Sequence, residues 1–450
     1  MSQVKWLRCW VIAGASLIFY GWWSAWFVLL LVGTATFDFL AALSMQRWPR
    51  YSRVILGFSL FANLGTLALF KYLDFFITNL NSGFSLLGFT ASIPLAHLIL
   101  PVGISFYTFQ SMSYTIDVYR GHIKPTTSLG QYLAFISMFP QLVAGPIVRA
   151  VDMLPALAKA PHMSPEGRWS GFQWMVHGYF KKMVIADNLA PIVDSAFASN
   201  TSHSSGFWWF IVVMFAFQIY CDFSGYSDIA RGLGEWMGYR FPVNFNHPYT
   251  AIGFRDFWSR WHMSLSTWFR DYVYFPLGGN RRGVLRTHVN LWVTMLISGF
   301  WHGAAWTFIL WGGVHAALLS FEQVTNWSDR IQKFGWFGRV AGAGITFIFI
   351  CFTWVLFRAN SLPQAGQILY AMCTPRLGGE IDLVRQFGVL PIGLVVVIML
   401  REAYFLTGLN LLAIKIFDKS NYARSLSLAA TIVVTIFFRG PGQSFVYFQF

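Results

Sequence analysis

"FWHGAAWTFILWGGVH", residues 300–315, contains two histidines inside a long apolar segment. No Asp, Glu, Lys or Arg occurs between Arg286 and Glu322. As one straight helix this segment would be about 50 Å long, whereas the hydrocarbon core of a bilayer is about 30 Å thick. The helix must therefore break. Gly299 and Gly303 mark the expected place, because irregular backbone at membrane depth is tolerated only inside protein or beside a water-filled cavity.

Such a break would place His302 beside a cavity. An ionisable side chain inside a membrane segment is a functional candidate by default, and the alternative is a core histidine that is hydrogen-bonded to a neighbouring helix. On a continuous helix His315 would lie about 140° around the axis and about 20 Å along it from His302. The two rings would then not share a site, so we expect His315 to pack or to support other groups.

The composition is that of a membrane protein. Of 450 residues, 56% are hydrophobic and only 11% are charged, which is unusual for a water-soluble globule. The net charge of +14 fits the excess of Lys and Arg in the cytoplasmic loops of membrane proteins. The sequence has no basic and aromatic recognition module, so we expect no nucleic-acid partner.

Apolar segments of about 20 residues, the length that crosses a bilayer as a helix, predict about ten or eleven spans in an all-α membrane protein. They lie near 6–22, 24–45, 53–76, 95–118, 128–148, 172–193, 206–224, 288–320, 340–357, 387–405 and 425–438. No linker separates a soluble part, so residues 1–450 are expected to form one membrane-embedded domain whose motifs lie within about 50–320. The four cysteines are far apart and indicate neither a disulfide framework nor a metal site.

The segment 254–272, "FRDFWSRWHMSLSTWFRDY", has the pattern of an amphipathic helix. Its apolar residues recur at i, i+3, i+4 and i+7, and Arg, Asp, Ser and Thr occupy the remaining positions. So charged a face cannot cross lipid. We therefore predict one helix at the cytoplasmic interface with its aromatic side chains turned inward. His262 falls on the inward stripe, where its polarity needs a partner, unless it only bridges the interface.

Five polar residues lie at the end of an apolar run in "YCDFSGYSDIARGLG", residues 220–234. They are Asp222, Ser224, Tyr226, Ser227 and Asp228. Two interpretations stay open: these side chains form the polar wall of a substrate passage, or they cap the backbone groups of a helix terminus.

The loop "PLGGNRRG", residues 276–283, combines glycines with Asn280, Arg281 and Arg282. Backbone amides and guanidinium groups both suit phosphate oxygens, so the loop could hold the phosphates of a nucleotide-like donor. Equally, it could serve only to orient the chain, because the Lys and Arg distribution places the segment 231–286 in the cytoplasm. The sequence has no nucleophile elbow, phosphate loop or zinc helix, which leaves a mechanism based on a buried base and a passage.

Five stretches, in order, closely resemble the membrane-bound O-acyltransferase family. They are "LPVGISFYTFQSMSYTIDVYRG" (100–121), "FPQLVAGPIVR" (139–149), "YCDFSGYSDIARGLG" (220–234), "FWSRWHMSLSTWFRDYVYFPLGGNRRG" (257–283) and "GFWHGAAWTFILWGGVHA" (299–316). Within the family they look most like the branch that acetylates exported polysaccharides such as alginate. The resemblance implies a ring of tilted helices, with re-entrant and interfacial helices, around a transmembrane tunnel.

The resemblance also implies roles for individual residues. It makes His302 of the "WHG" motif catalytic, with Trp301 beside it, and makes His262, 40 positions upstream, a second residue of the same tunnel. The implied donor is acetyl-CoA, with no bound cofactor or metal. The implied partner is a periplasmic acetyltransferase or acyl-acceptor protein of an envelope polysaccharide complex, at the bacterial inner membrane.

In the expected mechanism a buried, neutral His302 removes the proton from an incoming hydroxyl, while His262 orients that base or polarises the thioester carbonyl. Three other interpretations stay open. They are D-alanyl transfer from a carrier protein to a cell-envelope polymer, a proton-coupled transporter whose histidines relay protons, and a non-catalytic scaffold.

Overall fold

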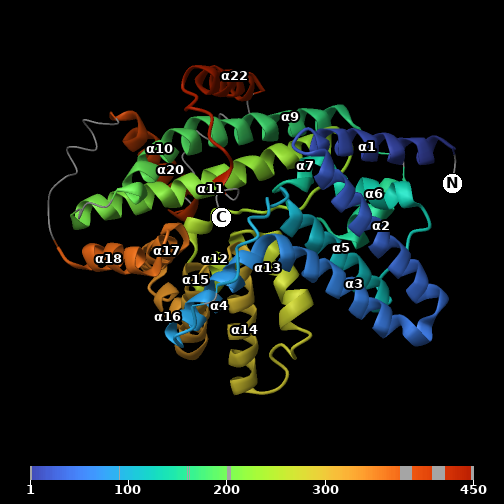
Figure 1. Ribbon diagram of the computed structural model, residues 1–450. Coiled ribbons are helices and arrows are strands. Elements are labelled where there is room, and N and C mark those ends of the chain that lie inside the picture. Colours follow the sequence, from blue (N-terminus) through green and yellow to red (C-terminus); the bar gives the residue numbers. More distant parts are fainter. Residues whose placement is uncertain are drawn as a thin grey trace. The chain divides into compact units, whose positions relative to one another are not determined.

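The computed structural model describes residues 3–90, 92–159, 161, 163–199, 204–375, 388–407 and 421–446. Over these ranges the chain forms helices and no strand (Figure 1). It divides into two compact units: Met1–Gly171 with Leu233–Pro242, and Phe172–Gly232 with Val243–Phe450. The prediction of an all-α protein is confirmed.

The first unit is a set of apolar helices. Its elements are α1 (Gln3–Gly21), α2 (Ala25–Arg47), the 3₁₀ turn η1 (Pro49–Tyr51), α3 (Ser52–Leu67), the π-helical turn η2 (Ala68–Tyr72), α4 (Leu73–Leu86), α5 (Ile104–Tyr119), α6 (Leu129–Ser137), α7 (Phe139–Leu142) and α8 (Ala150–Ala158). The span predicted near 128–148 is interrupted between α6 and α7. Pro140 lies in the first turn of α7, and its missing N–H cannot continue the helix before it.

A buried carboxylate ties three helices of this unit together. Asp38 of α2 accepts hydrogen bonds from Ser59 Oγ (2.6 Å) and Asn63 Nδ2 (2.7 Å) of α3. It also accepts one from Ser111 Oγ of α5 (2.5 Å). Asp38 is fully buried, so these donors replace the water that the carboxylate loses on folding.

The second unit carries the motifs. Helices α9 (Pro165–Tyr179) and α11 (Ser205–Trp236) have residues in both units. The other elements are the π-helical turn η3 (Phe180–Ala186), α10 (Asp187–Ala198), the 3₁₀ turn η4 (Pro248–Thr250), α12 (Phe254–Arg260), α13 (Met263–Phe269), the π-helical turn η5 (Arg270–Tyr274), α14 (Val284–His302), α15 (Trp306–Thr325), α16 (Trp327–Gln332), α17 (Gly335–Arg358), α18 (Leu362–Cys373), α20 (Leu390–Thr407) and α22 (Asn421–Phe437).

Within the described residues, four continuous helical stretches are long and apolar enough to cross a membrane. They are Ala25–Arg47, Pro49–Leu86, Ser205–Trp236 and Gly335–Arg358. Other predicted spans form shorter or interrupted helices. The number of crossings and the tunnel therefore stay predictions.

The long apolar segment 288–320 breaks where the sequence predicts. Helix α14 ends at His302, Gly303 is extended (φ −162°, ψ 151°), and α15 begins at Trp306. The two helices then pack side by side as a hairpin (Figure 1). A Cβ on Gly299 would collide with the backbone oxygen of Phe308 and would lie 3.1 Å from Cα of Gly312. The glycines thus let the two backbones approach closely.

The prediction of one amphipathic helix over 254–272 is wrong in one respect. The helix is interrupted at His262, whose backbone is in the left-handed conformation (φ 43°, ψ 53°). The segment just before α12 satisfies the backbone groups at this break, because Asn246 N donates to Arg260 O (3.0 Å) and Met263 N donates to Asn244 O (2.9 Å). The predicted inward stripe is otherwise confirmed. Seven of its apolar side chains are buried: Phe254, Phe257, Trp261, Leu265, Trp268, Phe269 and Tyr272.

Candidate active site

His302 is the last residue of α14, at the turn of the hairpin. Its ring is surrounded by aromatic rings, with centroid distances of 4.9 Å to Trp301, 5.0 Å to Trp311 and 5.3 Å to Phe357. Only 4% of the residue is exposed. Since α14 ends here, the histidine sits where regular backbone stops, as the sequence predicts.

His262 also contacts the indole of Trp301. Its ring centroid is 6.4 Å from that of Trp301, which in turn contacts His302. It also meets Phe223 of α11 edge to face at 4.6 Å, and none of its surface is exposed. Two histidines that are 40 positions apart in the sequence therefore contact the same tryptophan, Trp301, within one unit.

The hydrogen bonds of Asn244 determine the tautomer of His262. Asn244 Oδ1 accepts from the backbone N (3.3 Å) and from Oγ (2.9 Å) of Ser264, and its Nδ2 donates to Ser227 Oγ (3.2 Å). Because a backbone N–H can only donate, the atom facing it is the amide oxygen. His262 Nδ1 lies 3.0 Å from that same oxygen and therefore carries the hydrogen.

In a neutral imidazole with hydrogen on Nδ1, the lone pair lies on Nε2. His262 is located between two helices of seven residues each, which are too short to span a membrane. Burial lowers the pKa of His262 to about 3, so its ring is neutral at pH 7. Nε2 can accordingly accept a proton or a hydrogen bond but cannot donate one.

The polar residues of 220–234 lie inside α11, so the interpretation that they cap a helix terminus is wrong. Asp222 pairs with Lys182 (2.7 Å) of η3, and Asp228 pairs with Lys181 (2.6 Å). Ser224 is buried, and the ring of Tyr226 contacts Phe445 at 5.5 Å. The two aspartates bind lysines and contact neither histidine through any hydrogen bond that the described part of the chain shows.

Of the α11 residues that reach the site, Ser227 belongs to the predicted polar stretch, whereas Phe223 was not predicted. Phe223 packs on His262, and Ser227, one turn later, holds Asn244. Residues four apart lie on one face of a helix, so Phe223 and Ser227 form the face turned to the site. For Phe223 the available signal was its i, i+4 spacing from Ser227. For Asn244 the sequence gives none, because its role depends on the break at His262.

Residues 438–446 lie across η3 and α11. Gly440 N donates to Met183 O (2.8 Å), and Lys182 Nζ donates to Gln443 O (3.1 Å). Val446 N donates to Oδ2 of the buried Asp222 (2.7 Å). Just before it, Phe445 packs against Phe223 with a centroid distance of 5.5 Å. This segment, in which the sequence shows no motif, thus supports the wall that carries Phe223.

Asn280, Arg281 and Arg282 are exposed in the loop before α14. The side chain of Asn290 holds this loop by donating to Gly279 O (2.9 Å). Helix α14 separates the loop from His302 by about 27 Å, at about 1.5 Å per residue. The loop therefore does not share a site with the histidine ring, and its contact with a donor stays a prediction.

His315 lies closer to His302 than a continuous helix would allow. The hairpin folds α15 back, so Trp311 contacts His302 at 5.0 Å and His315 at 4.6 Å between ring centroids. His315 is buried and also packs against Trp258 at 5.0 Å. These ring contacts agree with the predicted packing role.

A cavity of about 450 Å³ lies beside α12 and is lined by neither histidine. The passage expected to lead to His302 stays a prediction.

Comparison with known proteins identifies the class. The model of the membrane-bound O-acyltransferase family matches residues 120–362, which include both histidines and Trp301. The chain belongs to this family and is a membrane-embedded acyltransferase.

Curated relatives cover most of the chain. A probable alginate O-acetylase of Pseudomonas putida is 39% identical over 366 residues, which are 80% of this chain and 73% of the relative. A peptidoglycan O-acetyltransferase of Helicobacter pylori is 39% identical over 393 residues, 81% of this chain and 73% of the relative. A teichoic acid D-alanyltransferase of Bacillus subtilis is 29% identical over 291 residues, 59% of this chain and 70% of the relative.

Proposed function

We propose that this acyltransferase takes acetyl groups from acetyl-CoA on the cytoplasmic side of the bacterial inner membrane and passes them outward for O-acetylation of an exported polysaccharide. The observation that carries the proposal is the pair of buried histidines whose rings both contact Trp301, inside the segment that matches the family. The partner would be a periplasmic acetyltransferase or acyl-acceptor protein. Alginate is one candidate polymer, since several relatives are named as probable alginate O-acetylases.

The chemistry is the transfer of an acetyl group from sulfur to oxygen. A hydroxyl of the acceptor attacks the thioester carbonyl, a base removes the hydroxyl proton, and the carbon–sulfur bond breaks to release the thiol of coenzyme A. His302 would act as the base, because its ring is buried among aromatic side chains and a neutral imidazole accepts protons. Such a base contributes typically about 10²–10⁴-fold to the rate.

His262 would assist as a hydrogen-bond acceptor. Its Nδ1 is engaged with Asn244, so in the neutral ring Nε2 offers a lone pair. This favours orienting the base or the incoming hydroxyl over polarising the thioester carbonyl, which would need a donor. Of the two roles that the sequence predicted for His262, the orienting role is therefore the one that we propose.

D-alanyl transfer is the alternative with a named relative. The D-alanyltransferase of Bacillus subtilis matches 59% of this chain, whereas the two O-acetylating relatives match 80% and 81%. Acetyl transfer is therefore the better supported of the two.

The test compares His302→Ala with His288→Ala. Both histidines lie in α14. His288, however, is hydrogen-bonded to Ser320 of α15 (Nδ1 to Oγ, 3.2 Å) and does not lie at the hairpin turn. Acetyl esters on the exported polysaccharide would be measured in cells in which both variants insert normally. We expect His302→Ala to lower ester content by about 10²-fold or more and His288→Ala to leave it near the wild-type level. Wild-type ester content in His302→Ala would refute the catalytic assignment.

The donor is tested separately with purified protein. Acetyl-CoA and a D-alanyl carrier protein would be offered in parallel, and release of the free thiol would be followed. Turnover of acetyl-CoA alone supports the proposal, whereas turnover of the charged carrier alone replaces it with D-alanyl transfer.

A further inference from the structure

The cavity beside α12 is lined mainly by polar residues. It has a volume of about 450 Å³ and is lined by residues of α12, α15, α16 and the loops next to them: Ile252, Arg255, Asp256, Ser259, Arg260, Glu322, Asn326, Ser328, Asp329 and Gln332. Ile252 is the one apolar residue in this set. Sites for apolar small molecules are lined mainly by hydrophobic side chains, so this cavity suits a polar ligand.

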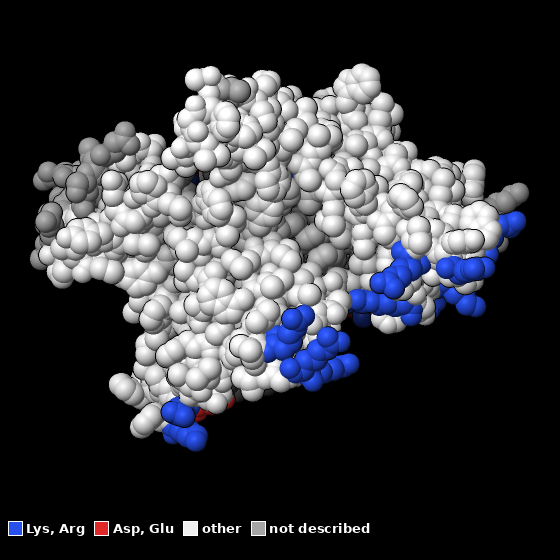
Figure 2. All heavy atoms as spheres, turned by 60° about the horizontal axis from the view of Figure 1, so that its bottom comes forward, with Lys and Arg blue, Asp and Glu red and all other residues white. Residues whose placement is uncertain are grey.

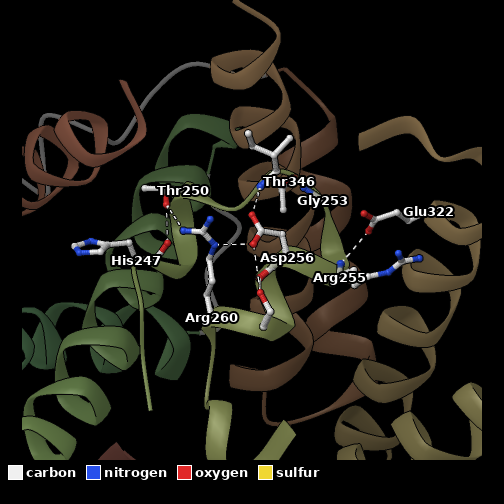
Figure 3. Close-up of polar contacts among 10 residues, drawn as sticks. His247, Thr250, Gly253, Arg255, Asp256, Arg260, Glu322 and Thr346 are labelled. Carbon is white, nitrogen blue, oxygen red and sulfur yellow. Dashed lines mark hydrogen bonds and ion pairs between the residues drawn. The ribbon is translucent and has the colours of Figure 1, made fainter. Parts of the chain in front are cut away.

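Part of its charge is already engaged within the protein (Figure 3). Arg260 Nε pairs with Asp256 Oδ1 at 2.7 Å. Glu322 accepts from two backbone N–H groups at the start of α12 (2.6 and 2.9 Å) and from Ser328 Oγ (2.7 Å). These three charged side chains hold the walls of the cavity.

One guanidinium and one carboxylate stay available to a ligand. Neither Arg255 nor Asp329 forms a side-chain ion pair or hydrogen bond with any residue that the structure describes. In Figure 3 the guanidinium of Arg255 extends away from α12. The cavity thus presents one positive and one negative group that lack partners.

This charge pattern discriminates between ligand classes. The lining contains two guanidinium groups against three carboxylates. A nucleotide with several phosphates would meet a net negative wall, which disfavours it. A zwitterion with one phosphate and one ammonium group matches the available Arg255 and Asp329, because guanidinium binds phosphate oxygens and carboxylate binds ammonium.

Large apolar side chains are exposed at positions that neighbour the cavity-lining residues in the sequence. They are Phe321, Val324, Phe334, Trp336 and Phe337. Exposed aromatic residues next to basic ones mark the headgroup level of a membrane, and the same stretch carries Arg330, Lys333 and Arg339. Figure 2 shows acidic surface beside one group of basic side chains.

We propose that the cavity binds the headgroup of a zwitterionic phospholipid with a primary ammonium group, of the phosphatidylethanolamine class. Arg255 donates to the phosphate oxygens, and Asp329 accepts from the ammonium group. The acyl chains then lie against the exposed aromatic residues that follow α16. A bound headgroup bridges α12 and α16.

The experiment uses the full chain, purified in detergent and reconstituted in nanodiscs of phosphatidylcholine that contain graded phosphatidylethanolamine or phosphatidylglycerol. Lipid retained by the protein is counted by native mass spectrometry for wild type, Arg255→Gln and Asp329→Asn. Arg286→Gln is the control, because Arg286 is an exposed arginine of α14 and does not line the cavity.

We expect each cavity variant to weaken phosphatidylethanolamine binding by about tenfold and the control to bind as wild type. Asp329→Asn should also raise phosphatidylglycerol binding, since a carboxylate that repels an anionic headgroup is gone. Equal phosphatidylethanolamine binding by all four proteins overturns the proposal. So does displacement of the lipid by acetyl-CoA, or binding of soluble phosphoethanolamine as tight as that of the lipid. Thermal unfolding in lipid-free detergent verifies that the variants fold, and no readout depends on acetyl transfer.

Discussion

The amide oxygen of Asn244 lies 3.0 Å from Nδ1 of His262 and accepts the hydrogen of that nitrogen. The same oxygen accepts two hydrogen bonds from Ser264, so the amide cannot rotate without losing both. Asn244 therefore assigns the lone pair of the neutral ring to Nε2.

Replacing Asn244 should impair acetyl transfer without removing either histidine. For Asn244→Leu we expect turnover to fall by about 10–100-fold, the usual effect of removing a partner that orients a functional histidine. Ser227→Ala is the control, because it removes only the hydrogen bond on the far side of the amide and should have a smaller effect. Steady-state acetyl-CoA turnover checks this, and unchanged turnover in Asn244→Leu would count against the orienting role.

Asn244→Asp should shift the pH dependence of the same reaction. Burial lowers the pKa of His262 to about 3, so its ring stays neutral over the usual pH range. A carboxylate beside Nδ1 stabilises the protonated ring and raises this pKa. Activity should then be lost at a higher pH on the acid side than in wild type. A pH profile that superimposes on that of wild type would show that His262 does not need to be neutral.

The close approach of α14 and α15 predicts a large effect from one methyl group. Gly299→Ala would push its Cβ into the backbone oxygen of Phe308, which cannot move aside like a side chain. We expect a loss of about 1–3 kcal/mol in the free energy of unfolding, the usual cost of overpacking. In the control Gly313→Ala, the nearest atom is a side-chain methyl group of Leu296 at 3.7 Å. Thermal unfolding in detergent compares the two, and equal stability would contradict the packing of the hairpin.

Lys182→Met should destabilise the second unit. It leaves the buried carboxylate of Asp222 without its cation, at a cost of roughly 3 kcal/mol, the lower end for breaking a buried pair because Lys182 is partly exposed. The double variant Lys182→Met with Asp222→Asn should recover part of this loss, since Asp222 is then neutral and only Asp187, which also pairs with Lys182 at 2.8 Å, stays buried without its cation. Chemical unfolding measures both, and a double variant less stable than Lys182→Met would disprove the pairing.

In the first unit, Asp38→Ala should be costly because three donors lose their acceptor. Each buried donor left unsatisfied costs about 1–3 kcal/mol. Asp152→Asn is the control, since Asp152 is exposed in the same unit. The midpoint of thermal unfolding should fall strongly for Asp38→Ala and stay near that of wild type for Asp152→Asn.

Local patterns in the sequence predicted the break between α14 and α15 and the buried stripe of 254–272, because both depend on neighbouring residues alone. The length of the apolar run demanded a break, and the glycines at 299 and 303 located it. The spacing of aromatic residues in 254–272 predicted the buried stripe, and His262 on that stripe is fully buried. Both inferences need only the helical repeat and the thickness of a bilayer.

The parts that were not predicted depend on residues distant in the sequence. The break at His262 is stable because backbone groups of Asn244 and Asn246 complete its hydrogen bonds, and the helical pattern of 254–272 contains no sign of it. Asp222 binds Lys182 and Val446 rather than facing the site, and no local pattern indicates either partner. Long-range pairing of this kind is decided by packing, which a periodicity does not encode.

The contact of Val446 with Asp222 joins residues 224 positions apart. During synthesis, α11 therefore emerges from the ribosome and enters the membrane long before residues 438–446 exist. Until then Lys182 is the group that neutralises Asp222. The wall behind Phe223 is thus completed only after 224 further residues have been added to the chain.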